Sequence, residues 1–240
     1  MPTERFFAEC RRMGLEGIDL ADPKDWPLLR AHGLVCSMVG SHAIEKGLNR
    51  PEHHAECLAA IREAIAAAAS NGYPNVIAFS GNSAGMSKDE GLRHCVAALR
   101  AIAPLAEQKG VTVCLELLNS KEHRDYMADS TAWCVELVRH VGSPNVKVLY
   151  DIYHAAVMGE DVAGDIRRHS DCWGHYHTAG CPGRHEWAGV QQTLDYPALL
   201  SAIATTGYDG FICHEFIPEN PDGFHGLRDA VAMTAHACAR

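Results

Sequence analysis

Short apolar segments alternate along the chain with longer segments whose apolar residues recur every three or four positions. The short segments are rich in β-branched residues and are too apolar for strands with one face in water. They are typical of a parallel sheet that is covered on both faces. We predict seven such strands, at residues 17–20, 34–39, 75–80, 111–118, 146–152, 172–178 and 210–217.

The longer segments predict helices. Their apolar spacing of three and four residues places one apolar stripe along each helix. Several end at a glycine, the residue that most readily takes the left-handed conformation found just beyond a helix. We predict eight helices, at residues 3–13, 23–32, 51–71, 90–109, 130–141, 162–170, 196–206 and 227–237.

The order of the predicted elements favours a TIM (β/α)8 barrel. Strands separated by helices form right-handed βαβ units, and such a barrel has eight strand–helix repeats in about 250 residues. A doubly wound sheet of the Rossmann type would carry Gly-x-Gly-x-x-Gly after an early strand, and the sequence has no such motif there. We therefore expect one α/β domain over residues 1–240, a TIM barrel that lacks its first strand.

The first predicted element is a helix, so the barrel would be short of one strand. A closed barrel leaves no strand edge unpaired, and each buried backbone group without a partner costs about 1–3 kcal/mol. We expect the natural protein to begin upstream of Met1, with about ten further residues that supply an apolar strand. The alternatives are a partner chain in that place and a barrel that closes with seven strands.

The charge balance argues against several classes of partner. With 21 lysines and arginines against 30 aspartates and glutamates, the formal charge is −9, which disfavours binding to nucleic acid. No run approaches the roughly 18 apolar residues that cross a bilayer, and the charged first residues do not resemble a signal peptide. We expect a cytoplasmic protein that acts on a small molecule, without a nucleic-acid or membrane partner. The sequence leaves open whether it is a monomer or a homo-oligomer.

The ten cysteines are scattered singly along the chain. The sequence contains no Cys-x-x-Cys pair, which disfavours a structural zinc site. Several cysteines lie within apolar runs, so we interpret them as buried, reduced thiols.

Polar residues lie near the carboxyl ends of the last four predicted strands, where TIM barrels hold their active sites. They are Glu116, Asp151, His177 and Glu215. A charged residue in an otherwise apolar strand is costly unless it is paired or binds a metal. Three carboxylates and one imidazole at successive strand ends predict an oxygen-rich site for a divalent metal ion, Mg²⁺, Mn²⁺ or Co²⁺, rather than a thiolate zinc centre.

Other polar residues near these strand ends allow more than one interpretation. His175 shares a strand face with His177 and lies deeper, so we expect it to be a hydrogen-bonded interior side chain. His154 follows the preceding strand and either caps the strand end or contacts a substrate. Arg184 and His185 lie in a loop rich in glycine and proline, where they are either solvated or placed to bind a substrate carboxylate.

Four sequence strings around these residues resemble a known family. The strings are LELLNSK, VLYDIYHA, GHYHTAG and HEFIP. Here and through most of its length the chain resembles the sugar isomerase/epimerase family of xylose isomerase-like TIM barrels, most closely its hydroxypyruvate isomerases. The resemblance implies that Glu116, Asp151, His177 and Glu215 are metal ligands. Where those isomerases often carry glutamine as the third ligand, this chain has His177, as the ketose epimerases do.

The resemblance also implies a substrate site and a reaction. The expected substrate contacts are Glu122, His154, Arg184 and His185. The expected function is a metal-dependent isomerase that transfers a proton through an enediolate, with hydroxypyruvate and tartronate semialdehyde as the interconverted pair. One of Glu116 and Glu215 takes the proton and the other returns it at the adjacent carbon, so both are candidate catalytic residues.

Three other functions are compatible with the same barrel. A ketose 3-epimerase or an inosose dehydratase can use the same four ligands. A phosphodiesterase like endonuclease IV needs more histidine ligands and a basic DNA-binding face, which the charge of −9 disfavours. A sugar-binding barrel without activity is the third alternative.

Overall fold

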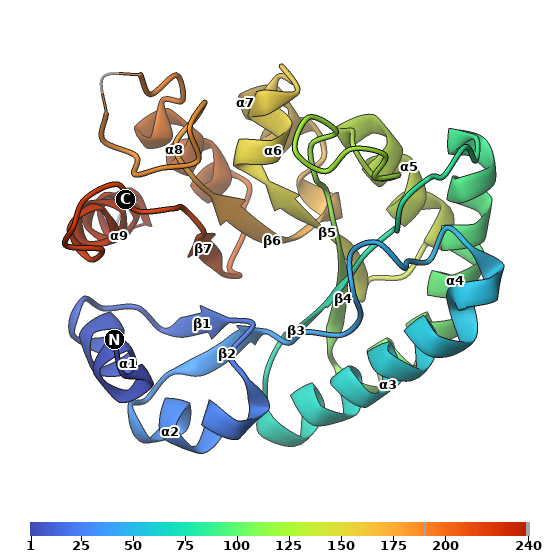
Figure 1. The fold of residues 1–240 in the computed structure, drawn as a ribbon, viewed down its shortest axis with the longest axis horizontal. Helices are drawn as coiled ribbons and strands as arrows, with labels where there is room; N and C mark the ends of the chain where they lie inside the picture. The colour runs from blue at the N-terminus through green and yellow to red at the C-terminus, as the bar shows by residue number, and fades with distance from the viewer. Residues whose placement is uncertain (190, 239–240) are drawn as a thin grey trace.

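Parallel strands form the wall of an open barrel, and helices surround it on the outside (Figure 1). The structure is a computed structural model that describes residues 1–189 and 191–238. Within these ranges there are seven strands, each inside a segment predicted from the sequence, so the prediction of a TIM barrel with seven strands is confirmed. They are β1 (Gly17–Asp19), β2 (Val35–Met38), β3 (Asn75–Ala78), β4 (Thr112–Glu116), β5 (Val146–Asp151), β6 (Trp173–Thr178) and β7 (Ile212–His214).

The described ranges contain nine α-helices, one more than the eight predicted. Two predicted helices begin with a 3-10 turn, at Pro23–Asp25 and Pro51–His53, before the α-helix proper. The α-helices are α1 (Thr3–Arg12), α2 (Trp26–Ala31), α3 (His54–Asn71), α4 (Lys88–Lys109), α5 (Thr131–Val141), α6 (Ile152–Val157), α7 (Val162–Arg168), α8 (Tyr196–Thr205) and α9 (His225–Cys238).

The helix that the sequence did not predict is α6. Its apolar residues continue the pattern of β5, and no polar turn separates the two elements. Asp151, the last residue of β5, caps α6, because its side chain accepts a hydrogen bond of 3.0 Å from the backbone N–H of His154. The chain therefore turns from strand to helix within one residue and holds His154 close to Asp151.

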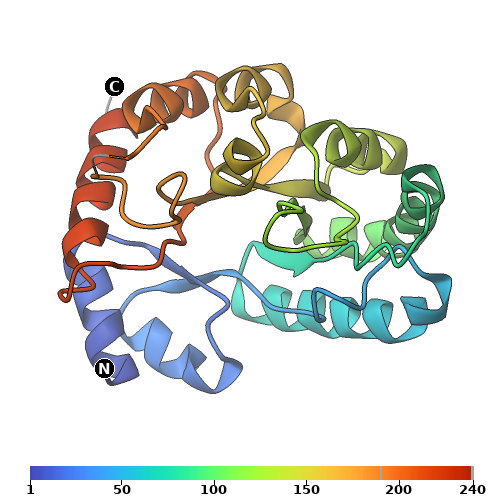
Figure 2. The same ribbon diagram turned by 45° about the horizontal axis from the view of Figure 1, so that its top comes forward.

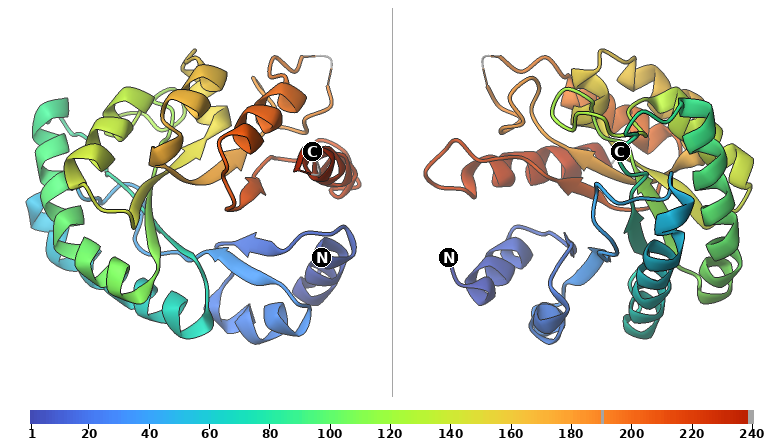
Figure 3. Two further views of the ribbon diagram at one scale, coloured as in Figure 1. Left: turned by 180° about the vertical axis from the view of Figure 1, so that it is seen from behind. Right: turned by 45° about the vertical axis from the view of Figure 1, so that its right-hand side comes forward.

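The strands form two sheets. One contains β3, β4, β5, β6 and β7 in chain order, and the other pairs β1 with β2; all ladders are parallel. A single bridge between Val39 and Val76 connects the two sheets. In the part of the chain that the structure describes, no ladder joins β7 to β1, so the barrel is open along that side, as Figures 1 and 3 show.

The helices at the two ends of the sequence flank this open side. Figure 2 shows α1 and α9 next to each other, and the ring of Phe6 stacks on that of Phe224 with centroids 6.1 Å apart. The backbone of β1 and the backbone of β7 are thus held near each other by side chains rather than by a strand ladder.

Buried apolar side chains fill the space between strands and helices. The helices α3 and α4 alone bury Ile61, Ile65, Leu99 and Ile102 completely. Every cysteine whose side chain is described is free, and all of these except the half-buried Cys213 are buried, as the sequence predicts for most of them. Among the described helices, none combines the length and the hydropathy required to cross a membrane.

Candidate metal and active site

The four side chains expected to bind metal lie together at one end of the barrel. Glu116 ends β4, Asp151 ends β5, His177 lies in β6, and Glu215 directly follows β7. One potential ligand atom from each lies within 4.8 Å of those of the others. The parallel register explains this convergence. It pairs Asp151 with His177, and it pairs His177 with Cys213, which lies two positions before Glu215.

A bound metal ion would compensate the cost of burying these charged groups. Glu116, Asp151 and His177 are 5%, 1% and 1% exposed. Burial raises the pKa of Glu116, and burial raises the pKa of Asp151 to about 6. Three carboxylates held this close repel one another unless a cation lies among them.

His177 directs one ring nitrogen at the carboxylates. Its Nδ1 lies 3.3 Å from Glu116 Oε1 and 3.2 Å from Glu215 Oε2. No N–H or O–H group of the described residues donates to this buried atom. A buried imidazole nitrogen facing two carboxylate oxygens is a donor set that fits a divalent metal ion.

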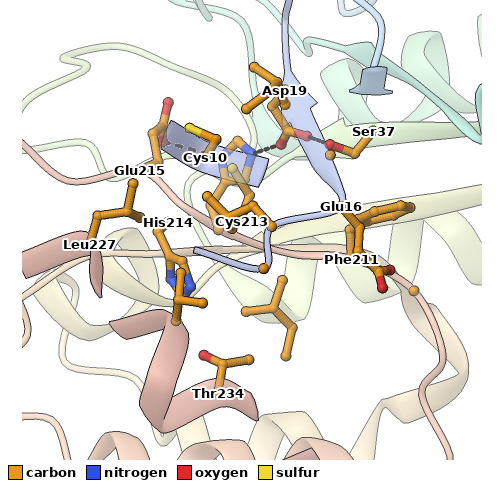
Figure 4. Close-up of a pocket in the computed structure, with 18 of the residues that line it drawn as sticks. Cys10, Glu16, Asp19, Ser37, Phe211, Cys213, His214, Glu215, Leu227 and Thr234 are labelled. Atoms are coloured by element: carbon orange, nitrogen blue, oxygen red, sulfur yellow. Dashed lines mark hydrogen bonds and ion pairs between the residues drawn. The ribbon is translucent and has the colours of Figure 1, made fainter. Parts of the chain in front are cut away.

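The other ring nitrogen of His177 is held by Asp19, a residue that the sequence analysis did not select. Asp19 Oδ2 lies 2.9 Å from His177 Nε2 and 2.7 Å from His175 Nε2, and Asp19 Oδ1 accepts a hydrogen bond from Ser37. Figure 4 shows this carboxylate joined to Ser37 by a dashed line. Asp19 ends a short apolar strand, so the pattern that singled out the other strand ends was also present here.

The contact between Asp19 and the histidines changes the pKa values of Asp19 and His177. Burial alone would raise the pKa of Asp19, but His175 and His177 lower it well below its usual range. Burial alone would lower the pKa of His177, but the carboxylates of Asp19, Glu116 and Glu215 around its ring raise it well above its usual range. The expectation that His175 is a hydrogen-bonded interior side chain is confirmed by its bond to Asp19.

His154 lies against Asp151 with its ring fully buried. Burial, and secondarily the charge of Arg184, lowers the pKa of His154 to about 3, so its ring is neutral. Asn119 Nδ2 contacts its Nδ1, which places the ring proton on Nε2. That Nε2 lies 3.5 Å from Asp151 Oδ2 and has no hydrogen-bond partner among the described residues.

Arg184 lies over the mouth of the site. Its guanidinium donates a 2.6 Å hydrogen bond to Glu215 Oε2 and lies 3.8 Å from Asp151 Oδ2. The same guanidinium is 5.3 Å from the centre of the Tyr153 ring, whose hydroxyl donates to Glu122. Arg184, Tyr153 and Glu122 therefore form one connected polar edge beside the cluster.

His185 is the predicted substrate contact that the structure turns away from the cluster. Its Nδ1 donates a 2.9 Å hydrogen bond to the carbonyl of Ile217, and its Nε2 lies 3.4 Å from Glu219. The backbone of Arg184 takes a left-handed conformation, with φ of +57°, and this turn sends the two neighbouring side chains in different directions.

The family model of xylose isomerase-like TIM barrels matches residues 7–236, which is nearly all of the chain. The chain belongs to this family. The match begins within α1 and includes all seven described strands, so membership rests on the barrel as a whole.

Individual relatives within and around this family match to different extents. The chain is 36% identical to 2-oxo-tetronate isomerase of Cupriavidus necator over 116 residues, which are 48% of this chain and 44% of that protein. It therefore spans about half the length of several of the curated relatives it matches. It is 23% identical to hydroxypyruvate isomerase of Escherichia coli over 226 residues, which are 89% of this chain and 87% of that protein.

Among solved structures, D-psicose 3-epimerase of Clostridium cellulolyticum with D-tagatose superimposes with a TM-score of 0.80. The identity is 18%, and the superposition covers 99% of this chain and 94% of the other. At this identity the similarity shows the common fold alone.

Proposed function

We propose that this protein is a metal-dependent isomerase of small hydroxy-carbonyl acids, with hydroxypyruvate and tartronate semialdehyde as the interconverted pair. The observation that carries the proposal is the convergence of Glu116, Asp151, His177 and Glu215 at the carboxyl ends of four barrel strands. The family match and the similarity to a hydroxypyruvate isomerase along most of the chain support it.

The four side chains would hold a divalent metal ion, for which Mg²⁺, Mn²⁺ and Co²⁺ are the candidates. When bound, such an ion polarises the carbonyl and the neighbouring hydroxyl oxygen of a substrate. The protein's part is to present three oxygen donors and one nitrogen donor, with Asp19 fixing the ring of His177 from behind.

The proton transfer is assigned to Glu116 and Glu215. One carboxylate removes a proton from the hydroxymethyl carbon, and the other returns a proton to the former carbonyl carbon. A second proton moves from the hydroxyl to the former carbonyl oxygen, so the product is an isomer with the same atoms. The buried Nε2–H of His154, which has no partner among the described residues, would donate to the oxygen that becomes charged.

The position of Arg184 is the reason for proposing a substrate that carries a carboxylate. A guanidinium grips a carboxylate through two parallel hydrogen bonds, and Arg184 already binds the carboxylate of Glu215 at the mouth of the site. A substrate carboxylate would take that place. A neutral ketose has no such group, so an acid substrate explains why an arginine lies here.

A ketose 3-epimerase is the second candidate, favoured by His177, the third-ligand residue type of the ketose epimerases. Turnover of the purified protein should be measured on hydroxypyruvate and on D-psicose, before and after EDTA, and after each metal is added back. We expect turnover of hydroxypyruvate, its loss in EDTA, and its return with a divalent ion. Faster conversion of D-psicose would favour the epimerase, and full turnover in EDTA would contradict metal dependence.

A further inference from the structure

Two loops meet beside the candidate metal site. The β6 loop (residues 179–189) follows β6, and the β7 loop (residues 215–224) connects β7 to α9. Arg184 lies in the first loop and Glu215 in the second, so the hydrogen bond between them also joins the loops. The two residues after Arg184, His185 and Glu186, have no part in the proposed reaction, and the side chains of both bind the β7 loop.

Arg184 and His185 bind the backbone of the β7 loop at one residue. The carbonyl of Arg184 accepts a 2.7 Å hydrogen bond from the N–H of Ile217, and His185 Nδ1 donates one of 2.9 Å to the carbonyl of Ile217. The carbonyl of His185 accepts a 2.8 Å bond from the N–H of Gly180, two residues after the end of β6. Ile217 is therefore held through both of its backbone groups, and this contact is anchored to the end of a barrel strand.

Glu186 binds the β7 loop through its carboxylate. Its Oε1 accepts hydrogen bonds of 3.0 and 3.1 Å from the backbone N–H groups of Glu219 and Asn220, and its Oε2 accepts one of 3.1 Å from Glu219. Burial alone would raise the pKa of Glu186, but these donors lower it, so the side chain binds as a carboxylate. Hydrogen bonds to an ionised acceptor are stronger than those between neutral groups, so Glu186 contributes more to this contact than the backbone bonds of Ile217.

The stem of the Glu186 side chain lies against the first turn of α9. A Cβ atom at Gly226 would lie 2.0 Å from Cγ of Glu186 and 2.8 Å from its Cβ. A glycine at this position leaves room for the side chain, although glycine is unfavourable within a helix. The position of Glu186 is therefore fixed by packing as well as by its hydrogen bonds.

We propose that Glu186, assisted by His185, is a positioning residue that clamps the β7 loop to the β6 loop and so holds the guanidinium of Arg184 beside Glu215. The backbone of Arg184 has a φ of +57°, a conformation that an arginine seldom takes without support from its surroundings. The contacts of the next two residues supply that support. Arg184 then meets a substrate carboxylate from a fixed position, and binding does not have to order the loop. The effect on turnover rests on the proposed function, whereas the clamp is a property of the two loops.

Two variants remove the clamp from opposite sides. Glu186→Ala removes the carboxylate, and Gly226→Ala displaces the Glu186 side chain, because the added methyl group takes the place of its stem. Glu186→Gln keeps a side-chain oxygen that can accept from the same N–H groups, so it should retain most of the clamp. The matched control is Asp222→Ala, since Asp222 also accepts from a backbone N–H of the β7 loop, that of Phe224, but does so from within that loop.

Chemical modification of Arg184 by phenylglyoxal, located by mass spectrometry, reports the position of the guanidinium without any substrate. The Arg184 side chain is 20% exposed and is paired with Glu215. We expect modification of Arg184, and hydrogen exchange of the Glu219 and Asn220 amides, to be about tenfold faster in Glu186→Ala and Gly226→Ala, the scale of losing hydrogen bonds to a charged group. Both rates should stay near those of the unchanged protein in Glu186→Gln and Asp222→Ala.

Kinetics test the consequence for catalysis. A guanidinium that binds the substrate carboxylate equally in the ground state and the transition state affects KM rather than kcat. We expect Glu186→Ala to raise KM for hydroxypyruvate by about tenfold and to change kcat by less than about threefold. A variant that only lowered the folded fraction would lower kcat and leave KM unchanged.

Two results would overturn the proposal. The first is that modification of Arg184 and amide exchange are no faster in Glu186→Ala than in Asp222→Ala. The second is an unchanged KM in Glu186→Ala of an enzyme that turns over hydroxypyruvate, because Arg184 then binds substrate without help from Glu186. If the unchanged protein did not turn over hydroxypyruvate, the proposed function would be wrong, and the modification and exchange rates would still decide whether Glu186 holds Arg184.

Discussion

The central strands and the edge strands of the barrel hold the same site in different ways. Glu116 and Asp151 lie at the ends of β4 and β5, strands paired on both sides, and their side chains are 7% and 2% exposed. Glu215 follows β7, an edge strand, and its side chain is 40% exposed. Asp19 belongs to β1, the opposite edge of the opening. The site thus joins a rigid half to an open half, and His177 contacts both.

This difference shows which groups the fold fixes by itself. A carboxylate on a central strand is positioned by two ladders and by the helices behind them, while one at an edge depends on side-chain partners. Glu215 has Arg184 and His177 as such partners, and Asp19 has the two histidines and Ser37. Changes in the rigid half should therefore remove function outright, and changes at the open side should weaken it.

The largest effect is expected for Asp151→Ala. This change removes one carboxylate from the buried cluster. We expect metal affinity to fall by more than about 10²-fold, which exceeds the usual effect of losing a residue that only hydrogen-bonds to a metal ligand. Turnover should be lost in parallel. The barrel should remain folded, because the apolar core lies below the site. Calorimetric titration with Mn²⁺ and circular dichroism measure the two quantities.

Asp161→Ala is the matched control for this change. Asp161 caps α7 as Asp151 caps α6, by accepting from a backbone N–H three residues later. We expect Asp161→Ala to cost about 1 kcal/mol of stability and to leave metal binding intact. Equal metal affinity in Asp151→Ala and Asp161→Ala would show that Asp151 is only a helix cap.

Glu116→Gln and Glu215→Gln should each lower turnover by about 10²-fold or more, the usual scale for a general acid–base group. Metal content must be measured in the same preparations, since each glutamate has two proposed roles. Glu52→Gln, at an exposed position outside the cluster, serves as control. A turnover near that of the unchanged protein in either variant would exclude that glutamate as a proton carrier.

Asp19→Asn tests the open half through a residue outside the four proposed metal ligands. Asp19 holds the ring of His177 from its far nitrogen, and loss of such a partner typically costs about 10- to 100-fold in metal affinity. Asp22→Asn, an exposed aspartate three residues on, is the control. Unchanged Mn²⁺ affinity in Asp19→Asn would mean that the strand ladders alone orient His177.

The smallest effect is a dependence of stability on pH in the rigid half. The pKa of His154 falls from its ordinary 6.5 to about 3 in the folded chain, so the unfolded chain binds more protons between these values. Stability should therefore be lost as pH falls below 6.5, by about 2 kcal/mol at pH 5 from this group. Urea unfolding of metal-free protein at pH 7 and pH 5 measures it.

His154→Gln provides the comparison for this pH effect. Glutamine does not titrate, so the difference in stability between pH 7 and pH 5 should shrink in this variant by the share that belongs to His154. An unchanged difference would assign the whole pH dependence to other groups.

Periodicity was sufficient to predict the barrel strands and most helices, because a strand buried on both faces and an amphipathic helix each leave a regular apolar pattern. It failed at α6, where a single residue, Asp151, both ends a strand and caps a helix. The apolar pattern runs through this junction without interruption, so only the backbone geometry separates the two elements.

The sequence by itself determined which polar residues stand at the ends of the last four strands, because a charge in an apolar strand is conspicuous wherever the strand lies in space. It could not determine that Asp19, more than 150 residues away, would hold His177 across the barrel. It also could not separate Arg184, which faces the cluster, from His185, which faces the next loop. Those outcomes depend on how closely strand edges and loops approach one another in the folded protein. The packing of the core sets this approach, and the spacing of residues along the chain does not.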